Sequence, residues 1–216
     1  MSLEKYKLVI NEDFTKDVDF MSTTINKLNL DKKSMILDIG TGIGAMSILL
    51  ALDGFNVLTG EPELDHRKDE LNHHSHEGPH VCHGEEHHEH FNGVWNDWRE
   101  SASALGVTNK IKYQHFDAEN LPFSQKTFDG IFMYDSLQHI KNRKRALEES
   151  LRVMKSNGMI CVIEWNQKSI DEDYDKYGYK IDYIDPREIL NRDNTLTEMI
   201  KGKYLNIFVI RKNIKE

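Results

Sequence analysis

The chain has 216 residues, a formal net charge of −8 and 38% hydrophobic residues. This length suits one α/β domain with a sizeable core, and no apolar run is long enough to span a membrane. The negative charge disfavours a nucleic-acid substrate, because no large cluster of lysine and arginine offsets it. Cys82 and Cys161 give no disulfide framework, and the first residues lack the apolar core of a signal peptide. We therefore expect a cytoplasmic protein without membrane or nucleic-acid partners, and its oligomeric state stays open.

The first periodic segment, residues 13–28, has apolar side chains at alternating spacings of four and three. This spacing predicts an amphipathic N-terminal helix with one apolar face. Two interpretations remain open at this point. The helix is either an ordinary packing helix or a partial lid over a site that follows it. The residues that define the apolar face are Phe14, Val18, Met21, Ile25 and Leu28.

A glycine-rich turn follows the first predicted strand, at residues 35–39. Gly40, Gly42 and Gly44 stand at every second position, and a helix is predicted over 44–53. Glycines let the backbone turn tightly and approach a ligand, and the helix start offers free N–H groups. The pattern is D-x-G-x-G-x-G and not the dinucleotide fingerprint G-x-G-x-x-G, because position 45 is alanine. No Lys-Ser or Lys-Thr pair follows, which excludes a P-loop.

The second predicted strand, residues 55–60, runs directly into Glu61. An acid at the end of the second strand of a βαβ unit is placed to accept hydrogen bonds from ribose hydroxyls. The alternative is an ordinary solvated loop acid. The glycine turn upstream favours the ribose role.

Residues 66–90 break the composition of the chain, because they contain nine of its eleven histidines. Neutral imidazoles and a thiolate are good ligands for zinc, nickel, cobalt or copper. The spacings are short and redundant, which is typical of a metal-storage or metal-sensing tract, and the alternative is a polar insertion without a role. We expect a subset of the following residues to bind metal: His73, His74, His76, His80, Cys82, His83, His87, His88 and His90.

Alternating helices and strands resume after the histidine-rich segment. The elements predicted there are a helix over 95–105, a strand over 110–116, a strand over 128–134, a helix over 142–155, a turn at Asn157-Gly158 and a buried strand over 159–165. Strands that alternate with helices in this way indicate a mostly parallel sheet with helices on both faces.

The C-terminal part begins with a polar stretch, residues 166–183, that holds four of the eight tyrosines. These tyrosines either line the rim where such folds bind substrate or pack on the sheet along a surface crossover. A short helix is predicted over 186–190, with proline in its first turn, and a hairpin over 195–211 closes the chain. The tyrosines are Tyr174, Tyr177, Tyr179 and Tyr183.

In the order of its motifs, the chain resembles the class I S-adenosylmethionine-dependent methyltransferases, and within them the ubiquinone/menaquinone-biosynthesis type. The resemblance implies a single domain over 1–216, an α/β, Rossmann-like, doubly wound fold, and a seven-stranded, mostly parallel sheet with an antiparallel C-terminal edge strand. The matching blocks are Ile36 to Gly44, Glu61, Asp117 to Phe123, Phe128 to Ile140, Arg152 to Gly158 and Tyr204 to Lys212.

The resemblance also implies a role for each cofactor-binding residue. The glycine turn would pass close to the methionine and ribose parts of S-adenosylmethionine, and Asp38 would orient that turn. Glu61 would accept hydrogen bonds from the ribose diol, and Asp117 would accept one from the adenine amino group. The residues assigned to cofactor binding are Asp38, Gly40, Thr41, Gly42, Gly44, Glu61, Asp117, Ala118 and Tyr134.

Methyl transfer is an in-line displacement in which the enzyme mainly positions the nucleophile. A general base is needed only if the acceptor arrives protonated. Asp135 and His139 are the candidates for that base, and the alternative for His139 is a structural role near the start of the following helix. Nothing in the residues distinguishes O-, N-, S- or C-methylation of the small-molecule acceptor.

The histidine-rich segment is where the chain departs from the family pattern. It leaves from the carboxyl end of the second strand, the edge at which ligands enter open α/β sheets. We therefore expect a methyltransferase with a metal-binding loop at the mouth of its site. The alternative is a metal-responsive binding protein that keeps the cofactor fold without transferring methyl groups. A nicotinamide-dependent oxidoreductase is disfavoured by the glycine spacing.

Overall fold

The computed structural model describes residues 3–63, 97–178, 181–190 and 193–213. The histidine-rich segment and all nine of its proposed metal ligands lie outside the described residues. The helices are α1 (Leu3–Val9), η1 (Glu12–Thr15), α2 (Val18–Lys27), α3 (Ala45–Leu52), α5 (Trp98–Ala104), η3 (Thr108–Lys110), η4 (Leu137–His139), α6 (Arg143–Val153), α7 (Gln167–Tyr177) and α8 (Pro186–Ile189). The strands are β1 (Ile36–Ile39), β2 (Val57–Gly60), β3 (Ile111–Tyr113), β4 (Phe128–Tyr134), β5 (Met154–Trp165), β6 (Thr195–Lys201) and β7 (Leu205–Lys212).

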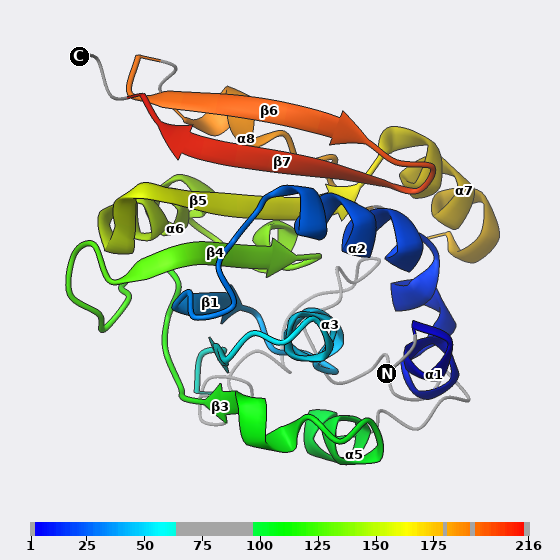
Figure 1. The fold of residues 1–216 in the computed structure, drawn as a ribbon. Helices are drawn as coiled ribbons and strands as arrows, with labels where there is room; N and C mark the ends of the chain where they lie inside the picture. The colour runs from blue at the N-terminus through cyan, green and yellow to red at the C-terminus, as the bar shows by residue number, and fades with distance from the viewer. Residues whose placement is uncertain (1–2, 64–96, 179–180, 191–192, 214–216) are drawn as a thin grey trace, which may run out of the picture.

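The strands form one seven-stranded sheet in the order β3-β2-β1-β4-β5-β7-β6 (Figure 1). The first five strands in this order are parallel, and β7 is antiparallel to both β5 and β6. The predicted α/β fold with a mostly parallel seven-stranded sheet is confirmed. The antiparallel strand lies one place in from the edge, because β6 forms the outermost strand beside it.

Two hydrophobic clusters cover the two faces of the sheet. Successive strand residues point to opposite faces, so Ile36 packs with α2, α3 and α5, whereas Leu37 packs with α6 and α8. The same alternation continues in β4, where Phe132 belongs to the first cluster and Ile131 to the second. The sheet is therefore buried on both sides, as its near-continuous apolar strands predict.

The N-terminal segment differs from the single helix predicted over 13–28. The structure divides it into η1 and α2, because Asp17 leaves the helical conformation with φ of −120° and ψ of 25°. The Asp17 carboxylate accepts hydrogen bonds from the backbone N–H groups of Tyr204 (2.6 Å) and Leu205 (3.1 Å). The helix therefore begins at Val18, where it can bury Met21 and Ile25, and Asp17 ties its start to β7.

After β4 the structure corrects one prediction and adds one helix. The predicted turn at Asn157-Gly158 lies inside β5, where the pairing with β4 shifts register between Phe128 and Gly130. The start of the polar stretch 166–183 forms α7, which Asn166 caps by accepting from Ser169 N–H at 3.0 Å. An asparagine directly before a helix is a common capping residue, so Asn166 was a sequence signal for the start of α7.

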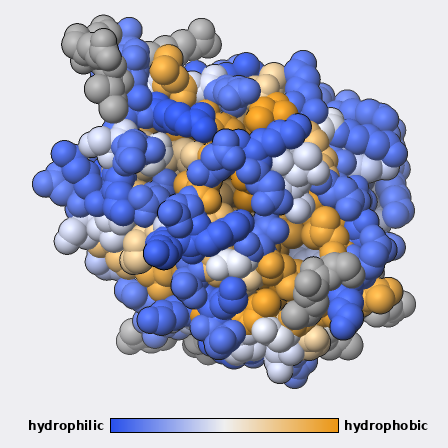
Figure 2. Space-filling view, in the orientation of Figure 1, coloured by the Kyte–Doolittle hydropathy of each residue, from blue (hydrophilic) through white to orange (hydrophobic). Residues whose placement is uncertain are grey.

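The described part of the chain contains no helix long and apolar enough to cross a membrane. Hydrophilic side chains cover most of the face seen in Figure 2, and hydrophobic ones show through between them. Figure 1 places α1, α2 and α7 beside the end of the sheet to which β4 and β5 point. This end is the carboxyl edge, where the candidate site lies.

Candidate cofactor and acceptor site

The candidate site lies where β1, β2 and β4 end side by side. Strand order reverses between β1 and β4, so this is a switch point at which open α/β sheets bind ligands. The first residue of the glycine turn is tied to β2, because Gly40 N–H donates to the Gly60 carbonyl at 3.0 Å.

The three glycines of the turn adopt backbone conformations that other residues rarely reach. Gly40, Gly42 and Gly44 have φ of 91°, 45° and 80°. A Cβ on Gly40 would lie 2.6 Å from Ser136 Cβ, and one on Gly44 would lie 2.8 Å from Trp98 Cβ. A Cβ on Gly42 would meet nothing within 4 Å. The outer two glycines thus permit close packing inside the protein, whereas Gly42 faces open space.

Asp38 lies beneath the turn with only 1% of its surface exposed. Its Oδ2 accepts hydrogen bonds from the hydroxyls of Ser47 and Thr59, the latter at 3.0 Å. Its Oδ1 is buried and has no hydrogen-bond partner among the described residues. Burial raises the pKa of the Asp38 carboxyl to about 7, and the two hydroxyl donors oppose that rise. Asp38 therefore links the start of the turn to α3 through Ser47 and to β2 through Thr59. These two hydroxyl donors were not identified from the sequence.

Two further contacts shape the open side of the turn. Thr41 Oγ1 lies 2.9 Å from Thr59 Oγ1, so this hydroxyl pair joins the turn to β2. The Gly42 N–H donates to Glu61 Oε2 at 3.2 Å. The structure thus brings Glu61, from the end of β2, against the one glycine of the turn that faces open space.

The predicted adenine-binding residues follow β3. Asp117 is exposed, and its Oδ1 accepts a hydrogen bond from Glu119 N–H at 2.8 Å. Its backbone carbonyl accepts from Asn120 N–H at 3.0 Å, which closes a tight turn. Ala118 is buried beside Phe116 and Leu121 in the second hydrophobic cluster. The residues just before Asp117 are fixed beside the end of β2, because Phe116 N–H donates to the Glu61 carbonyl at 3.1 Å.

Tyr134 ends β4 and meets the N-terminal segment. Its hydroxyl donates to the Phe14 carbonyl at 3.3 Å, and the two rings meet edge-to-face with centroids 5.6 Å apart. Burial raises the pKa of the Tyr134 phenol well above its usual value. Within the predicted 13–28 segment, η1 therefore contacts the end of β4 through Phe14.

Asp135 follows Tyr134 with φ of 51°, a left-handed conformation that asparagine and aspartate tolerate best. Its carboxylate accepts a hydrogen bond from the Gln138 side-chain amide. Burial raises the pKa of Asp135 to about 7, while hydrogen bonds from Gln138 and Trp165 oppose the rise and the nearby Asp173 adds to it. A carboxyl group that titrates near neutral pH is suited to accept a proton.

Glu164 is a second buried carboxyl group at this edge, and the sequence reasoning missed it. It is 2% exposed, and its Oε1 accepts from Leu137 N–H at 2.9 Å. Burial and the charge of Asp135 raise the pKa of Glu164 well above its usual value. The signal was an acid inside the apolar run Met159 to Trp165, since a charged residue in a buried strand requires partners or a proton.

Ser136 completes this side of the site. Its side chain is 9% exposed, and its hydroxyl has no hydrogen-bond partner among the described residues. His139 lies in η4 with an exposed side chain, and its backbone N–H donates to the Ser136 carbonyl at 3.1 Å. The structure thus places His139 on the turn after β4, close in sequence to Asp135 but on the outside of the molecule.

The described tyrosines after β5 are partly exposed. Tyr174 is 54% exposed, Tyr177 42% and Tyr183 41%, while Tyr179 lies outside the described residues. The Tyr183 side chain hydrogen-bonds to Asn206 of β7, so it touches the sheet, and the choice between rim and packing roles stays open for Tyr174 and Tyr177. Tyr174 and Tyr177 belong to α7, which lies beside the carboxyl edge (Figure 1).

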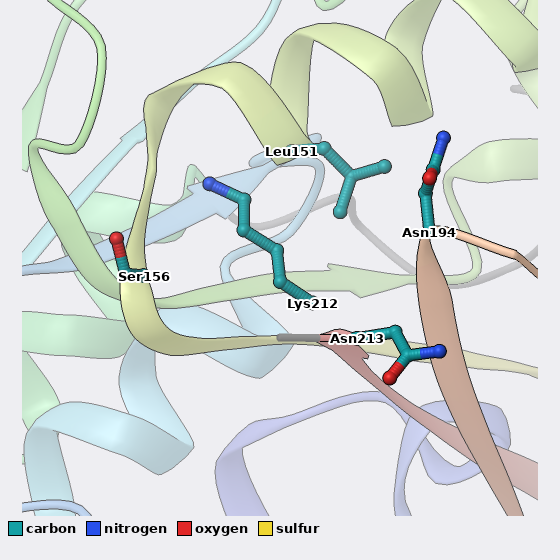
Figure 3. A pocket seen from close by; sticks show the side chains of 5 residues that line it. All are labelled: Leu151, Ser156, Asn194, Lys212 and Asn213. Carbon is teal, nitrogen blue, oxygen red and sulfur yellow. The ribbon is translucent and has the colours of Figure 1, made fainter. Parts of the chain in front are cut away.

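Two other features lie apart from this site. No group of three or more His, Cys, Asp or Glu side chains suited to a metal ion occurs within the described ranges. A surface pocket at the opposite end of the sheet is lined by Leu151, Ser156, Asn194, Lys212 and Asn213 (Figure 3). The Lys212 ammonium there donates to the Met154 carbonyl at 2.9 Å. This pocket is at the start of β5 and is not part of the candidate site.

Comparison with known proteins agrees with this geometry. Residues 92–162 match the family described as methyltransferase domain. The ubiquinone/menaquinone biosynthesis C-methyltransferase UbiE of Citrobacter koseri is 34% identical over 86 residues, which cover 38% of this chain and 34% of that protein. The corresponding protein of Idiomarina loihiensis is 30% identical over the same length. The chain thus spans about a third of the length of the curated relatives that it matches.

Solved structures extend the likeness in fold to nearly the whole chain. The PH0226 protein of Pyrococcus horikoshii OT3 is 17% identical with a TM-score of 0.66, over 95% of this chain and 93% of that one. A putative S-adenosyl-L-methionine-dependent methyltransferase of Methanococcus maripaludis is 16% identical with a TM-score of 0.60, over 94% and 88%. Residues 92–162 are therefore similar to a methyltransferase domain, and the chain as a whole shares the Rossmann-like fold of these solved structures. The expected resemblance to the ubiquinone/menaquinone-biosynthesis type is confirmed over 86 residues.

Proposed function

We propose that this protein transfers a methyl group from S-adenosylmethionine to a small-molecule acceptor. The observation that supports the proposal most directly is the pairing of Gly42 with Glu61 at the switch point of the sheet. An open glycine backbone beside a carboxylate suits a ligand that brings a ribose close to the main chain. When bound, S-adenosylmethionine supplies an electrophilic methyl group on a sulfonium sulfur.

The residues present fit this cofactor. Glu61 offers carboxylate oxygens to a ribose diol, and Asp117 offers its second oxygen to an amino group of a base. Buried polar atoms without partners are rare in proteins, and two occur here: Asp38 Oδ1, two residues before Gly40, and Ser136 Oγ, which lies beside Gly40. A ligand with both donor and acceptor groups seated over Gly40 would explain why the Ser136 hydroxyl has no partner in the protein alone.

On the acceptor side, we propose that Asp135 accepts a proton when the acceptor arrives protonated. Asp135 follows the end of β4, and its neighbour Ser136 packs against Gly40 of the glycine turn. The Asp135 carboxyl group itself accepts hydrogen bonds from Gln138 and Trp165. With a pKa of about 7, a substantial fraction of the Asp135 carboxyl groups is deprotonated at neutral pH. The carboxylate is then a stronger base than an aspartate with the ordinary pKa. We assign His139 a structural role on the turn and place the exposed tyrosines of α7 on the acceptor side of the site.

The test is transfer of isotopically labelled methyl from S-adenosylmethionine to a panel of phenols, amines, thiols and quinols. The matched controls are the same protein with Asp38→Asn and with Glu61→Ala. Label in one acceptor class, lost in both variants, would support the proposal. Binding of S-adenosylmethionine without transfer to any acceptor would favour the alternative, a binding protein that keeps the fold.

We also propose that the histidine-rich segment 66–90 binds a transition metal next to the site. The support is its composition and its place in the chain, since it follows Glu61 by only a few residues. Elemental analysis of the protein as purified and calorimetric titration with zinc and nickel would test this. We expect tight binding by the full chain and weak binding by a chain lacking 66–90. Equal binding by both chains would place any metal elsewhere.

A further inference from the structure

Helix α6 carries a row of charged side chains that face the segment after β3. Arg145, Glu149 and Arg152 are spaced four and three apart, so they lie on one side of the helix. The other side of α6 is buried in the core through Ala146, Leu147, Ser150 and Val153. Glu149 belongs to the charged row but is only 3% exposed. A charge this deeply buried indicates that its partners are specific.

The partners of Glu149 and Arg152 are the backbone groups of one loop, residues 117–123. Glu149 Oε2 accepts from the Leu121 N–H at 3.1 Å, and Arg152 Nη2 donates to the Leu121 carbonyl at 2.9 Å. Arg152 Nη1 donates to the Phe123 carbonyl at 2.8 Å. The two side chains also pair with each other, at 2.7 and 2.9 Å. They therefore hold both backbone groups of Leu121 in one bidentate arrangement.

A second pair of contacts holds the other half of the loop. Arg145 Nε donates to the Glu119 carbonyl at 3.1 Å, and Asn142 N–H donates to Glu119 Oε1 at 2.9 Å. Glu119 N–H in turn donates to Asp117 Oδ1 at 2.8 Å. Asp117 Oδ2 has no partner within the described ranges, so the chain of contacts from α6 ends on a free acceptor oxygen.

From this arrangement we propose that Glu149 and Arg152 are positioning residues for the adenine end of the cofactor. They touch no cofactor atom themselves. They fix the 117–123 loop in the shape that presents the Asp117 carboxylate and the Ala118 N–H to the base, and so set the preference for adenine. The inference rests on the proposed function, because it takes the bound ligand to contain adenosine.

The electrostatics of the Glu149–Arg152 ion pair favour its charged form. Arg152 lowers the pKa of the Glu149 carboxyl, and the Leu121 N–H adds to that effect. Both groups therefore stay ionised at neutral pH. The same helix also reaches the turn after β4, because Arg143 Nη2 donates to the Gln138 carbonyl at 3.0 Å. α6 thus contacts both the loop assigned to adenine and the turn that holds Asp135.

The experiment compares two ligands that differ only at the base. S-adenosylhomocysteine can donate its amino group to Asp117, whereas S-inosylhomocysteine carries an oxygen at that position and cannot. We expect wild type to prefer the adenosyl ligand at least tenfold by calorimetry. In Arg152→Gln and Glu149→Gln this preference should shrink to threefold or less, mainly through weaker binding of the adenosyl ligand.

Two control variants separate positioning from stability. Val153→Ala removes buried side-chain volume from the same helix but none of the hydrogen bonds to the loop, so it should lower the Tm but keep the base preference. Glu148→Gln removes the exposed pair with Lys144 (3.9 Å) and should change neither. The Arg152 and Glu149 variants are compared with Val153→Ala at temperatures where each protein is fully folded.

Each outcome decides a different claim. If wild type binds neither ligand, the proposed function fails. If wild type binds and discriminates but Arg152→Gln and Glu149→Gln discriminate equally well, the positioning inference fails alone. The inference also fails if Val153→Ala loses the base preference to the same degree, because the effect would then follow from loss of stability.

Discussion

The two halves of the site are built by different means. The cofactor half, at the ends of β1 and β2, consists largely of backbone: three glycines with positive φ and the Glu61 carboxylate on the Gly42 N–H. The half that we assign to the acceptor, at the ends of β4 and β5, consists of side chains, with the half-buried Asp135 raising the pKa of the buried Glu164. We propose that the first half recognises the fixed shape of a cofactor and that the second half exchanges protons with an acceptor.

The largest effect is expected on the acceptor half, from Asp135→Asn. Asparagine tolerates the left-handed φ of this position, so the fold should be kept. Loss of a general base lowers turnover by about 10²- to 10⁴-fold for an acceptor that arrives protonated. Affinity for S-adenosylmethionine should stay unchanged, and steady-state kinetics together with calorimetry measure both quantities.

The pH dependence of wild type sharpens the same prediction. A base must be deprotonated to act, and burial raises the pKa of Asp135 to about 7. Turnover should therefore rise as the pH increases through about 7, and this rise should be absent from the residual activity of Asp135→Asn. An unchanged turnover in the variant would remove Asp135 from the mechanism.

The next largest effect is expected on the cofactor half, from Gly40→Ala. The added Cβ would meet Ser136 Cβ at 2.6 Å and would force an unfavourable φ of 91°. Strain and overpacking together should lower the free energy of unfolding by about 2–4 kcal/mol, measured by chemical denaturation. Gly42→Ala, which meets no atom within 4 Å, is the matched control and should cost about 1 kcal/mol. Equal losses would contradict the packing role of Gly40.

Glu61→Ala should weaken cofactor binding by about 1–3 kcal/mol, the scale for removing a charged hydrogen-bond partner. Glu63→Ala is the control, because Glu63 is an exposed acid two residues further along the chain. Calorimetry with S-adenosylhomocysteine measures both variants. The ribose assignment would be wrong if the two variants bound equally tightly.

The smallest effect is expected from Glu164→Gln, and it should depend on pH. A carboxyl group with a raised folded-state pKa stabilises the fold fully below its unfolded pKa, and that contribution is lost as the pH rises through the folded value. Glutamine cannot ionise, so the variant should melt at a higher temperature than wild type at pH 8 to 9. A difference of about 2–4 °C is expected, shrinking toward pH 5. A variant that is less stable at every pH would show that Glu164 acts mainly through its hydrogen bond.

The contrast between a backbone-built half and a side-chain-built half of the site also explains what the sequence could predict. The glycine turn, the acid after β2 and the alternation of strands and helices are local patterns, and the structure places those elements in the expected order. Glu164 stands out as an acid inside an apolar run, but its contact with Leu137, and that of Ser136 with Gly40, could not be predicted because they join residues far apart in the chain. The division of the 13–28 segment at Asp17 likewise depends on Tyr204 and Leu205, which lie 187 and 188 residues away.

The most direct test of the account is calorimetric titration of the full chain with S-adenosylmethionine and, in parallel, with NAD. The glycine spacing, Glu61 and Asp117 together predict saturable binding of S-adenosylmethionine at one site, competition by S-adenosylhomocysteine and no binding of NAD. Tight binding of NAD with no heat from S-adenosylmethionine would contradict the account and would assign the glycine turn to a dinucleotide.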